Sequence, residues 1–319
     1  MKQPPYEINS KILKSVSSIS EKIGKLEASY LDRPDPQLRK ENKVKTIHSS
    51  LKIEGNTLSE EQITDIIENK RVIGEKREIR EVKNAINVYD RLKTFDPLSV
   101  ESFLLAHEIL MDDLIDNQGE FRKQGVGIFD DAGVTHLAPP AKKVPSLMQD
   151  LFKYLKESED LEIIKSCVFH YEVEFIHPFI DGNGRMGRLW QTVILMEEYP
   201  VFEYLPFETL ISQSLEEYYD VLAVCDNEGE STLFIEYVLD VIEDSLEELL
   251  ELNNRTMTNI DRLEYFISLG KDEFSRKDYM DVFKNISSST ASRDLRKGVK
   301  LDMLKKIGTK NKTTYKVKK

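Results

Sequence analysis

Hydrophobic positions recur at helical spacing along most of the chain. The first predicted helix covers residues 11 to 30, and its apolar face is formed by Ile12, Leu13, Val16, Ile19, Ile23 and Leu26. A second helix begins near Pro36 and places Val44 and Ile47 on one side. It ends at Gly55, because glycine is suited to a helix C-cap.

Further helical patterns follow on both sides of the middle of the chain. Two amphipathic helices are predicted over 59–96, and the first starts at a Ser59 cap with Gln62 as its capping-box partner. A later helix starts at Leu205-Pro-Phe-Glu-Thr and runs through Tyr218-Tyr219, and an acidic amphipathic helix covers 232–252. The pattern therefore predicts a mainly α-helical protein.

One stretch departs from helical spacing. After a helix over 98–116 and a turn at 119–122, two short apolar runs, 126–129 and 134–137, flank the residues 130–133. Two short runs around a polar, glycine-containing turn are typical of a β-hairpin.

Composition is that of a globular protein. The 319 residues are 40% hydrophobic and 32% charged, and the length predicts two or three domains. Charges interrupt the apolar runs before the roughly 18 residues needed to span a bilayer, and the first residues lack a signal-peptide core. We therefore expect a cytoplasmic protein without a membrane partner. Cys167 and Cys225 lie in apolar helical contexts, where we expect reduced thiols.

Charge is divided unevenly along the chain. The net charge is −12, yet residues 271–319 hold 15 Lys and Arg against 6 Asp and Glu. The tail from about 256 shows three short helical patterns, around Leu263, Tyr279 and 287–297, followed by a hairpin-like pair of segments. This order resembles a winged helix.

The third tail helix would present three basic side chains: Arg293, Arg296 and Lys297. DNA is a candidate partner for them. A winged helix used for protein contacts is an equal alternative, because basic charge alone provides only nonspecific attraction to nucleic acid.

The densest chemistry lies in the stretch from His177 to Arg188, His-Pro-Phe-Ile-Asp-Gly-Asn-Gly-Arg-Met-Gly-Arg. Helical patterns precede and follow it, so it is predicted to be a loop between two buried helices. Pro178 disfavours helical geometry at His177, and Gly182 and Gly184 let backbone N–H groups turn toward one point at the next helix. Such an N-terminus binds anions.

The loop side chains fit a nucleoside triphosphate. His177 can accept a proton at neutral pH, and Asp181 offers an oxygen ligand to Mg²⁺. Asn183, with the glycine amides, can hold phosphate oxygens. Arg185 and Arg188 are three residues apart, so both can face one polyphosphate. The apolar pair Phe179 and Ile180 is expected to anchor the loop to the core.

The register H-P-F-x-D-G-N-G-R-x-x-R resembles the signature of the Fic family of protein adenylyltransferases, and every specified position is filled. The resemblance implies that His177 deprotonates a target hydroxyl and that Asp181 holds Mg²⁺ on ATP. It assigns the binding of the ATP phosphates to Gly182, Asn183, Gly184, Arg185 and Arg188. AMP would be transferred and pyrophosphate released. The related Doc kinases have a lysine where this chain has Gly184.

The segment Ser50 to Gly55, Ser-Leu-Lys-Ile-Glu-Gly, resembles the inhibitory motif of many Fic proteins. By this resemblance, Glu54 pairs with Arg188 and denies the γ-phosphate its place, and Ser50 belongs to the same motif. Considered alone, the segment is also an ordinary helix end.

Two further regions match the family by position. The hairpin, followed by Ala138-Pro-Pro140, resembles the flap that aligns a target segment by strand addition, which assigns this role to Val134, Thr135 and His136. Tyr219 and Leu222 resemble the residues that line the adenine pocket. Asp226 stands where family members often have a base-reading asparagine.

The sequence thus predicts a Fic-type helical core with a β-hairpin flap and a C-terminal winged helix. The expected division is 1–95, with an inhibitory helix at about 37–55, then a catalytic core at 96–255 and the winged helix at 256–319. Two alternatives stay open for the function: removal of AMP from modified proteins, and a DNA-binding regulator with a nucleotide-sensing site. A homodimer is compatible with each.

Overall fold

The computed structural model divides the chain into two compact units, residues 1–250 and 251–319. The residues it describes are 4–29, 36–130, 133–254, 259–268, 270–271, 273–283, 286–308 and 313–318. Each unit has an apolar core of its own. The sequence predicts a boundary near residue 95, between an N-terminal region and a catalytic core. In the structure, residues on both sides of that boundary belong to the first unit.

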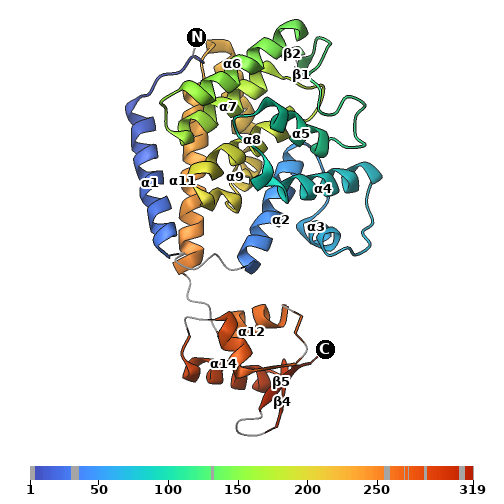
Figure 1. The fold of residues 1–319 in the computed structure, drawn as a ribbon, viewed down its shortest axis with the longest axis vertical. Coiled ribbons are helices and arrows are strands. Elements are labelled where there is room, and N and C mark those ends of the chain that lie inside the picture. Colours follow the sequence, from blue (N-terminus) through green and yellow to red (C-terminus); the bar gives the residue numbers. More distant parts are fainter. Residues whose placement is uncertain are drawn as a thin grey trace. The chain divides into compact units, whose positions relative to one another are not determined.

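The first unit is mainly helical, as predicted (Figure 1). Its helices in chain order are α1 (Ser10–Ser29), α2 (Pro36–Ile53), α3 (Glu60–Ile67), α4 (Lys76–Tyr89), α5 (Val100–Leu110), α6 (Val144–Glu157), α7 (Glu162–Ile176), α8 (Asn183–Glu198), α9 (Glu208–Gln213), α10 (Leu215–Glu228) and α11 (Thr232–Asn254). Three short 3₁₀ helices connect them: η1 (Leu92–Thr94), η2 (Ala141–Lys143) and η3 (Pro200–Glu203).

Helices α7 and α8 form the centre of this unit. Residues 163–171 of α7 and 185–195 of α8 are buried without interruption. A helix buried on all sides lies in the middle of a core, and the polar side chains of these two helices, such as His170 and Gln191, therefore bond to one another: His170 Nδ1 lies 2.8 Å from Gln191 Oε1. The loop between α7 and α8 is therefore held at both ends by buried helices.

The first helix packs against the last one of the unit. Figure 1 shows α1 beside α11, and Lys22 Nζ lies 3.0 Å from Glu243 Oε1 between them. Ile12 and Ile19 are buried as expected. The inclusion of Leu13 in the buried face was wrong, because its side chain is 60% exposed. Successive helical residues point about 100° apart, so Leu13 is turned away from α11.

Several predicted helix ends are confirmed. Gly55 follows α2 with φ of 89°, a value that favours glycine, and Ser59 and Gln62 form the capping box of α3. The single helix predicted from Leu205 was wrong: the chain forms α9 and α10, which are separated at Ser214. The Ser214 hydroxyl donates to Leu210 O at 3.0 Å, a local bond that competes with helix continuation.

The predicted hairpin is confirmed as β1 (Gly127–Asp130) and β2 (Gly133–Leu137), an antiparallel pair. Asp130 pairs with Gly133, so the turn is shorter than the four residues expected. The register shifts between Ile128 and Phe129. The side chains of both strands lie outside the described part of the structure, including Val134, Thr135 and His136.

The second unit contains α12 (Asn259–Ser268), β3 (Glu273–Ser275), α13 (Arg276–Val282), α14 (Ser288–Lys300), β4 (Leu304–Ile307) and β5 (Thr314–Val317). The strands form an antiparallel sheet in the order β3-β5-β4. The three helices and the hairpin follow the predicted order, whereas β3 was not predicted because it is only three residues long. The winged-helix assignment stays a prediction.

None of the helices that the structure describes combines the length and apolarity needed to cross a bilayer.

Candidate active site

The loop between α7 and α8 turns sharply at both of its ends. His177 is the C-cap of α7 and has left-handed backbone angles, φ 49° and ψ 60°, with its N–H bonded to Val173 O at 2.9 Å. Gly182 is the N-cap of α8, with φ 86°. A non-glycine residue in the left-handed region stores strain, which is typical of functional sites. The predicted loop between two core helices is confirmed.

Asn183 closes the loop on itself. Its Oδ1 accepts from Phe179 N at 2.8 Å, and its Nδ2 donates to Phe179 O at 3.1 Å. The side chain therefore braces the turn in this structure, and its predicted contact with phosphate stays a prediction.

Phe179 anchors the loop as expected, but Ile180 does not. The Phe179 ring is fully buried and stacks on His107 of α5, with ring centres 3.6 Å apart. Ile180 is 47% exposed, so its assignment as an anchor was wrong. In a turn this tight, adjacent side chains face opposite sides, and only one of them can reach the core.

The exposed part of the site is centred on the Asp181 carboxylate, whose side chain is 34% exposed. Arg185 Nη2 donates to Asp181 Oδ1 at 2.8 Å, and Arg77 Nη2 of α4 lies 3.3 Å from Oδ2. Arg185 is thus directed at the loop's own carboxylate, four residues earlier. Three charged groups meet here, two of them cationic.

His107 holds the backbone carbonyl group of Asp181. Its Nδ1 accepts from Gly119 N at 2.9 Å, so the proton lies on Nε2, which donates to Asp181 O at 3.0 Å. Burial lowers the pKa of His107 to about 4, so the ring is neutral and keeps this tautomer.

The buried part of the site contains Arg188 and the end of α2. Arg188 is 1% exposed, and its Nη2 lies 2.7 Å from Glu54 Oε1. The Nη2 group also donates to Ser50 O at 3.1 Å, and Nε donates to Ser50 Oγ at 3.3 Å. Ser50 therefore contacts the arginine itself. The structure brings together Ser50, Glu54 and Arg188, as the family resemblance implies.

Gly184 is the point where the groups of the buried part converge. A Cβ at this position would lie 2.7 Å from Glu54 Oε1, 3.0 Å from Arg188 Nη1 and 3.1 Å from Glu174 Oε1. A side chain here would displace the ion pair, so glycine is required for the observed arrangement.

Two more carboxylic acids, Glu174 and Glu208, lie close enough to Arg188 to interact with its charge. Glu174 Oε1 accepts from Tyr218 OH at 3.0 Å, and Glu208 Oε1 accepts from Tyr89 OH at 3.3 Å. Burial raises the pKa of each carboxyl to about 7, while the positive charge of Arg188 opposes the rise. The buried part of the site is therefore rich in acidic groups around one guanidinium.

The proposed adenine residues lie together on α10. Tyr219 is 49% exposed, Leu222 is half-buried, and Asp226 Oδ1 accepts from Tyr171 OH at 3.1 Å. Their contact with a base stays a prediction. The neighbouring Tyr218 is buried.

Three residues around the loop were not assigned a role from the sequence: Arg77, His107 and Arg122. Arg122 is 3% exposed and bonds to the backbone of the loop. Nothing in the local spacing of these residues indicates that they meet the motif, although the Gly119-Glu-Phe-Arg122 turn was noted.

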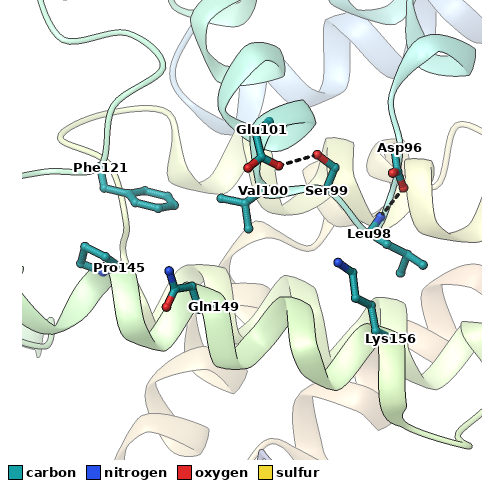
Figure 2. Close-up of a pocket in the computed structure, with 9 residues that line it drawn as sticks. All are labelled: Asp96, Leu98, Ser99, Val100, Glu101, Phe121, Pro145, Gln149 and Lys156. Atoms are coloured by element: carbon teal, nitrogen blue, oxygen red, sulfur yellow. Dashed lines mark hydrogen bonds between the residues drawn. The ribbon is translucent and has the colours of Figure 1, made fainter.

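A pocket of about 520 Å³ lies apart from the motif residues. Figure 2 shows it between the start of α5 and one side of α6, with Phe121 and Pro145 toward one end and Lys156 toward the other. It is an open surface depression, lined by Leu98, Glu101 and Gln149 among others. The chemistry of the loop does not depend on it.

Fold and site together define an α-helical protein with a glycine-containing loop of charged residues at the N-terminus of a buried helix. Residues 97–195 match the model of the Fic/DOC family. A crystal structure of a Fic family protein from Desulfovibrio desulfuricans G20 is 39% identical and has a TM-score of 0.78, with 99% of this chain and 98% of that chain covered. The chain belongs to the Fic family.

Proteins with assigned names are also similar. "Protein adenylyltransferase Fic" of Culex quinquefasciatus is 30% identical over 68% of this chain and 43% of its own length. "Protein adenylyltransferase fic-1" of Caenorhabditis elegans is 28% identical over 79% of this chain and 49% of its own. The chain thus spans less than half the length of these two curated relatives.

Proposed function

We propose that the protein transfers AMP from ATP to Ser, Thr or Tyr hydroxyl groups of target proteins and of itself, and that Glu54 inhibits this reaction. The observation that carries the proposal is the 2.7 Å ion pair between Glu54 and Arg188. It places a carboxylate on the arginine expected to bind phosphate, although 134 residues separate the two in sequence. The names of the similar proteins support the same chemistry.

The reaction requires a base, an in-line phosphate and a leaving group. His177 would remove the proton of the target hydroxyl, whose oxygen then attacks the α-phosphorus of ATP. A bond forms between that oxygen and the α-phosphorus, and the bond to the bridging oxygen breaks. Pyrophosphate leaves with the electron pair. The α8 N-terminus, with Gly182, Asn183 and Gly184, would stabilise the charge on the phosphates.

Asp181 would hold Mg²⁺. Within the described residues, no group of three or more His, Cys, Asp or Glu side chains gathers as a metal site. Asp181 nevertheless fits this ion, because Mg²⁺ is commonly bound by one or two carboxylates together with phosphate oxygens and water. Its carboxylate is exposed enough to be reached, and exposed ion pairs such as the one with Arg77 are weak. When bound, the ion neutralises phosphate charge.

Inhibition follows from competition for one guanidinium. A γ-phosphate needs the donors of Arg188 that Glu54 occupies, so ATP would bind with its phosphates displaced from in-line geometry. Arg185 would hold the outer phosphates after release from Asp181. Tyr219, Leu222 and Asp226 would surround the adenine, and the β1–β2 edge would align the target segment through backbone pairing.

The direct test uses ATP labelled separately at the α- and γ-phosphates with the Glu54→Gly variant. We expect the α label alone to appear on protein. His177→Ala in that background should lower labelling by about 10²- to 10⁴-fold while ATP affinity stays similar. Transfer of the γ label would contradict the proposal, and release of AMP from pre-labelled protein by the wild type would favour AMP removal.

The second unit has a candidate function of its own as a DNA-binding module in a cytoplasmic regulator. Arg293 and Arg296 are exposed on α14, and Lys297 is half-buried on the same helix. In the 319-residue chain, replacing these three residues with Ala should weaken binding to duplex DNA and flatten its salt dependence. If the wild type fails to bind duplex DNA at low salt, the module serves protein contacts, including homodimer formation.

A further inference from the structure

Arg122 holds three consecutive carbonyl groups of the catalytic loop. Its Nε donates to His177 O at 2.6 Å, its Nη2 to Ile176 O at 3.2 Å, and its backbone N–H to Pro178 O at 2.9 Å. These carbonyls lie where α7 ends, so the helix itself leaves them without intrahelical donors. Arg122 thereby fixes the left-handed turn that aims His177.

The same guanidinium also holds both ends of the flap. Nη1 donates to Gln124 O at 2.8 Å, three residues before β1 begins, and Nη2 donates to Pro139 O at 2.5 Å, two residues after β2 ends. One side chain therefore joins the loop that carries the base to the two strands of the hairpin.

The chemistry of the group suits this task. All four of its side-chain hydrogen bonds end on main-chain carbonyl oxygens, and the side chain is 3% exposed. Burial lowers the pKa of Arg122, yet a guanidinium keeps its charge, and the negative end of the α7 dipole favours a cation here. A planar fork with several fixed donors can span two backbone segments in a set geometry that the three donors of a compact ammonium group do not reproduce.

We propose that Arg122 is a positioning residue for AMP transfer, which sets the distance between the edge of the flap and the imidazole of His177. The inference rests on the proposed function, because a target strand paired to the flap must present its hydroxyl to that base. Arg122 touches neither ATP nor target in this account. It acts through the backbone of His177 and of the flap.

The test compares Arg122→Lys with its parent, the Glu54→Gly variant. Lysine keeps the charge but not the planar fork of donors. We therefore expect kcat for labelling a protein target to fall by about a hundredfold, because small misplacements of reacting groups lower rates by this factor. ATP affinity, measured by calorimetry, should stay within a few-fold. Arg262→Lys is the matched control: a largely buried arginine of the second unit, bonded to Asp294, whose replacement should leave labelling unchanged.

A second measurement does not depend on activity. Hydrogen exchange of the β1 and β2 amides, and of residues 177–180, should quicken together in Arg122→Lys and in Arg122→Gln, while α8 stays protected.

Full activity in Arg122→Lys, or flap amides that exchange as in the parent, would overturn the inference. If the parent itself transfers no AMP, the proposed function fails instead, and the exchange measurement still decides whether Arg122 couples the two segments.

Discussion

The buried and exposed parts of the site hold their charges in different ways. Arg188 is 1% exposed and pairs with the 28% exposed carboxylate of Glu54, with Glu174 and Glu208 close enough to affect the charge states in the buried part. Asp181, by contrast, is 34% exposed and lies between Arg185 and an Arg77 side chain that is 61% exposed. An ion pair with a fully buried member, such as Arg188, is held by its surroundings, whereas a pair of two partly exposed side chains, such as Asp181 and Arg77, exchanges readily with water and ions.

This difference suits the two proposed tasks. The Asp181 carboxylate can give up Arg77 when Mg²⁺ and phosphate arrive at little free-energy cost, whereas Arg185, which is 5% exposed, needs a phosphate oxygen in place of the carboxylate. Opening the pair of Glu54 with Arg188 would leave the guanidinium charge in the interior, so under the proposal this pair would block the site until a phosphate replaces Glu54. The contact between Glu54 and Arg188 is thus expected to be more resistant than that between Asp181 and Arg77.

The largest expected effect on stability is that of Arg188→Ala. Removing the cation leaves acidic groups in the interior without their counter-charge, and breaking a buried pair in this way lowers the free energy of unfolding by about 3–5 kcal/mol. Urea denaturation of the 319-residue chain measures the change. A loss below about 1 kcal/mol would mean that the buried part is no more strongly held than the surface.

A smaller effect is expected for Glu208→Gln. Burial raises the pKa of Glu208 to about 7, and Oε2 of its carboxyl group has no hydrogen-bond partner among the described residues. A folded pKa above the unfolded value of about 4.3 means that stability contributed by the neutral acid is lost as pH rises through 7.

The glutamine variant should therefore gain about 1–3 kcal/mol over the wild type at pH 8. At about pH 4, where the carboxyl is largely neutral in both the folded and the unfolded state, the difference should nearly vanish. Denaturation of both proteins at the two pH values measures this, and parallel pH profiles would contradict the assignment.

The smallest effect is expected for Arg77→Ala. An exposed pair contributes about 0.2–1 kcal/mol, so the loss in unfolding free energy should stay within that range. Arg80→Ala is the matched control, since Arg80 also lies on α4 and pairs with an exposed aspartate, Asp113, at 2.7 Å. A loss for Arg77→Ala well above that for Arg80→Ala would show that the exposed part is more strongly held than its burial indicates.

The parts of the site that could be predicted are those whose residues are contiguous. The loop from His177 to Arg188 and the helix end at Gly55 each specify their geometry through proline, glycine and short-range spacing. The pairing of Glu54 with Arg188 was expected only through the resemblance of two separate motifs, because no local pattern links residues 134 apart.

The parts that could not be predicted depend on side chains that reach across the fold. Arg77, His107 and Arg122 meet the loop from α4, from α5 and from the turn before the flap. The sequence around these three residues indicates only that they lie in a helix or a turn, and not that they contact the loop. Leu13 and Ile180 were misplaced for a related reason: an apolar residue next to a buried one in sequence is not always on the same side of its element.

The central claim is that Glu54 restrains AMP transfer by occupying Arg188, and auto-labelling with α-labelled ATP tests it most directly. Glu54→Gly should raise the rate by about 10²-fold or more, since positioning of reacting groups accounts for large parts of a barrier, while ATP affinity changes much less. Ser50→Ala should raise it more weakly, and adding Arg188→Ala to Glu54→Gly should abolish the gain. An unchanged rate in a folded Glu54→Gly protein would contradict the account.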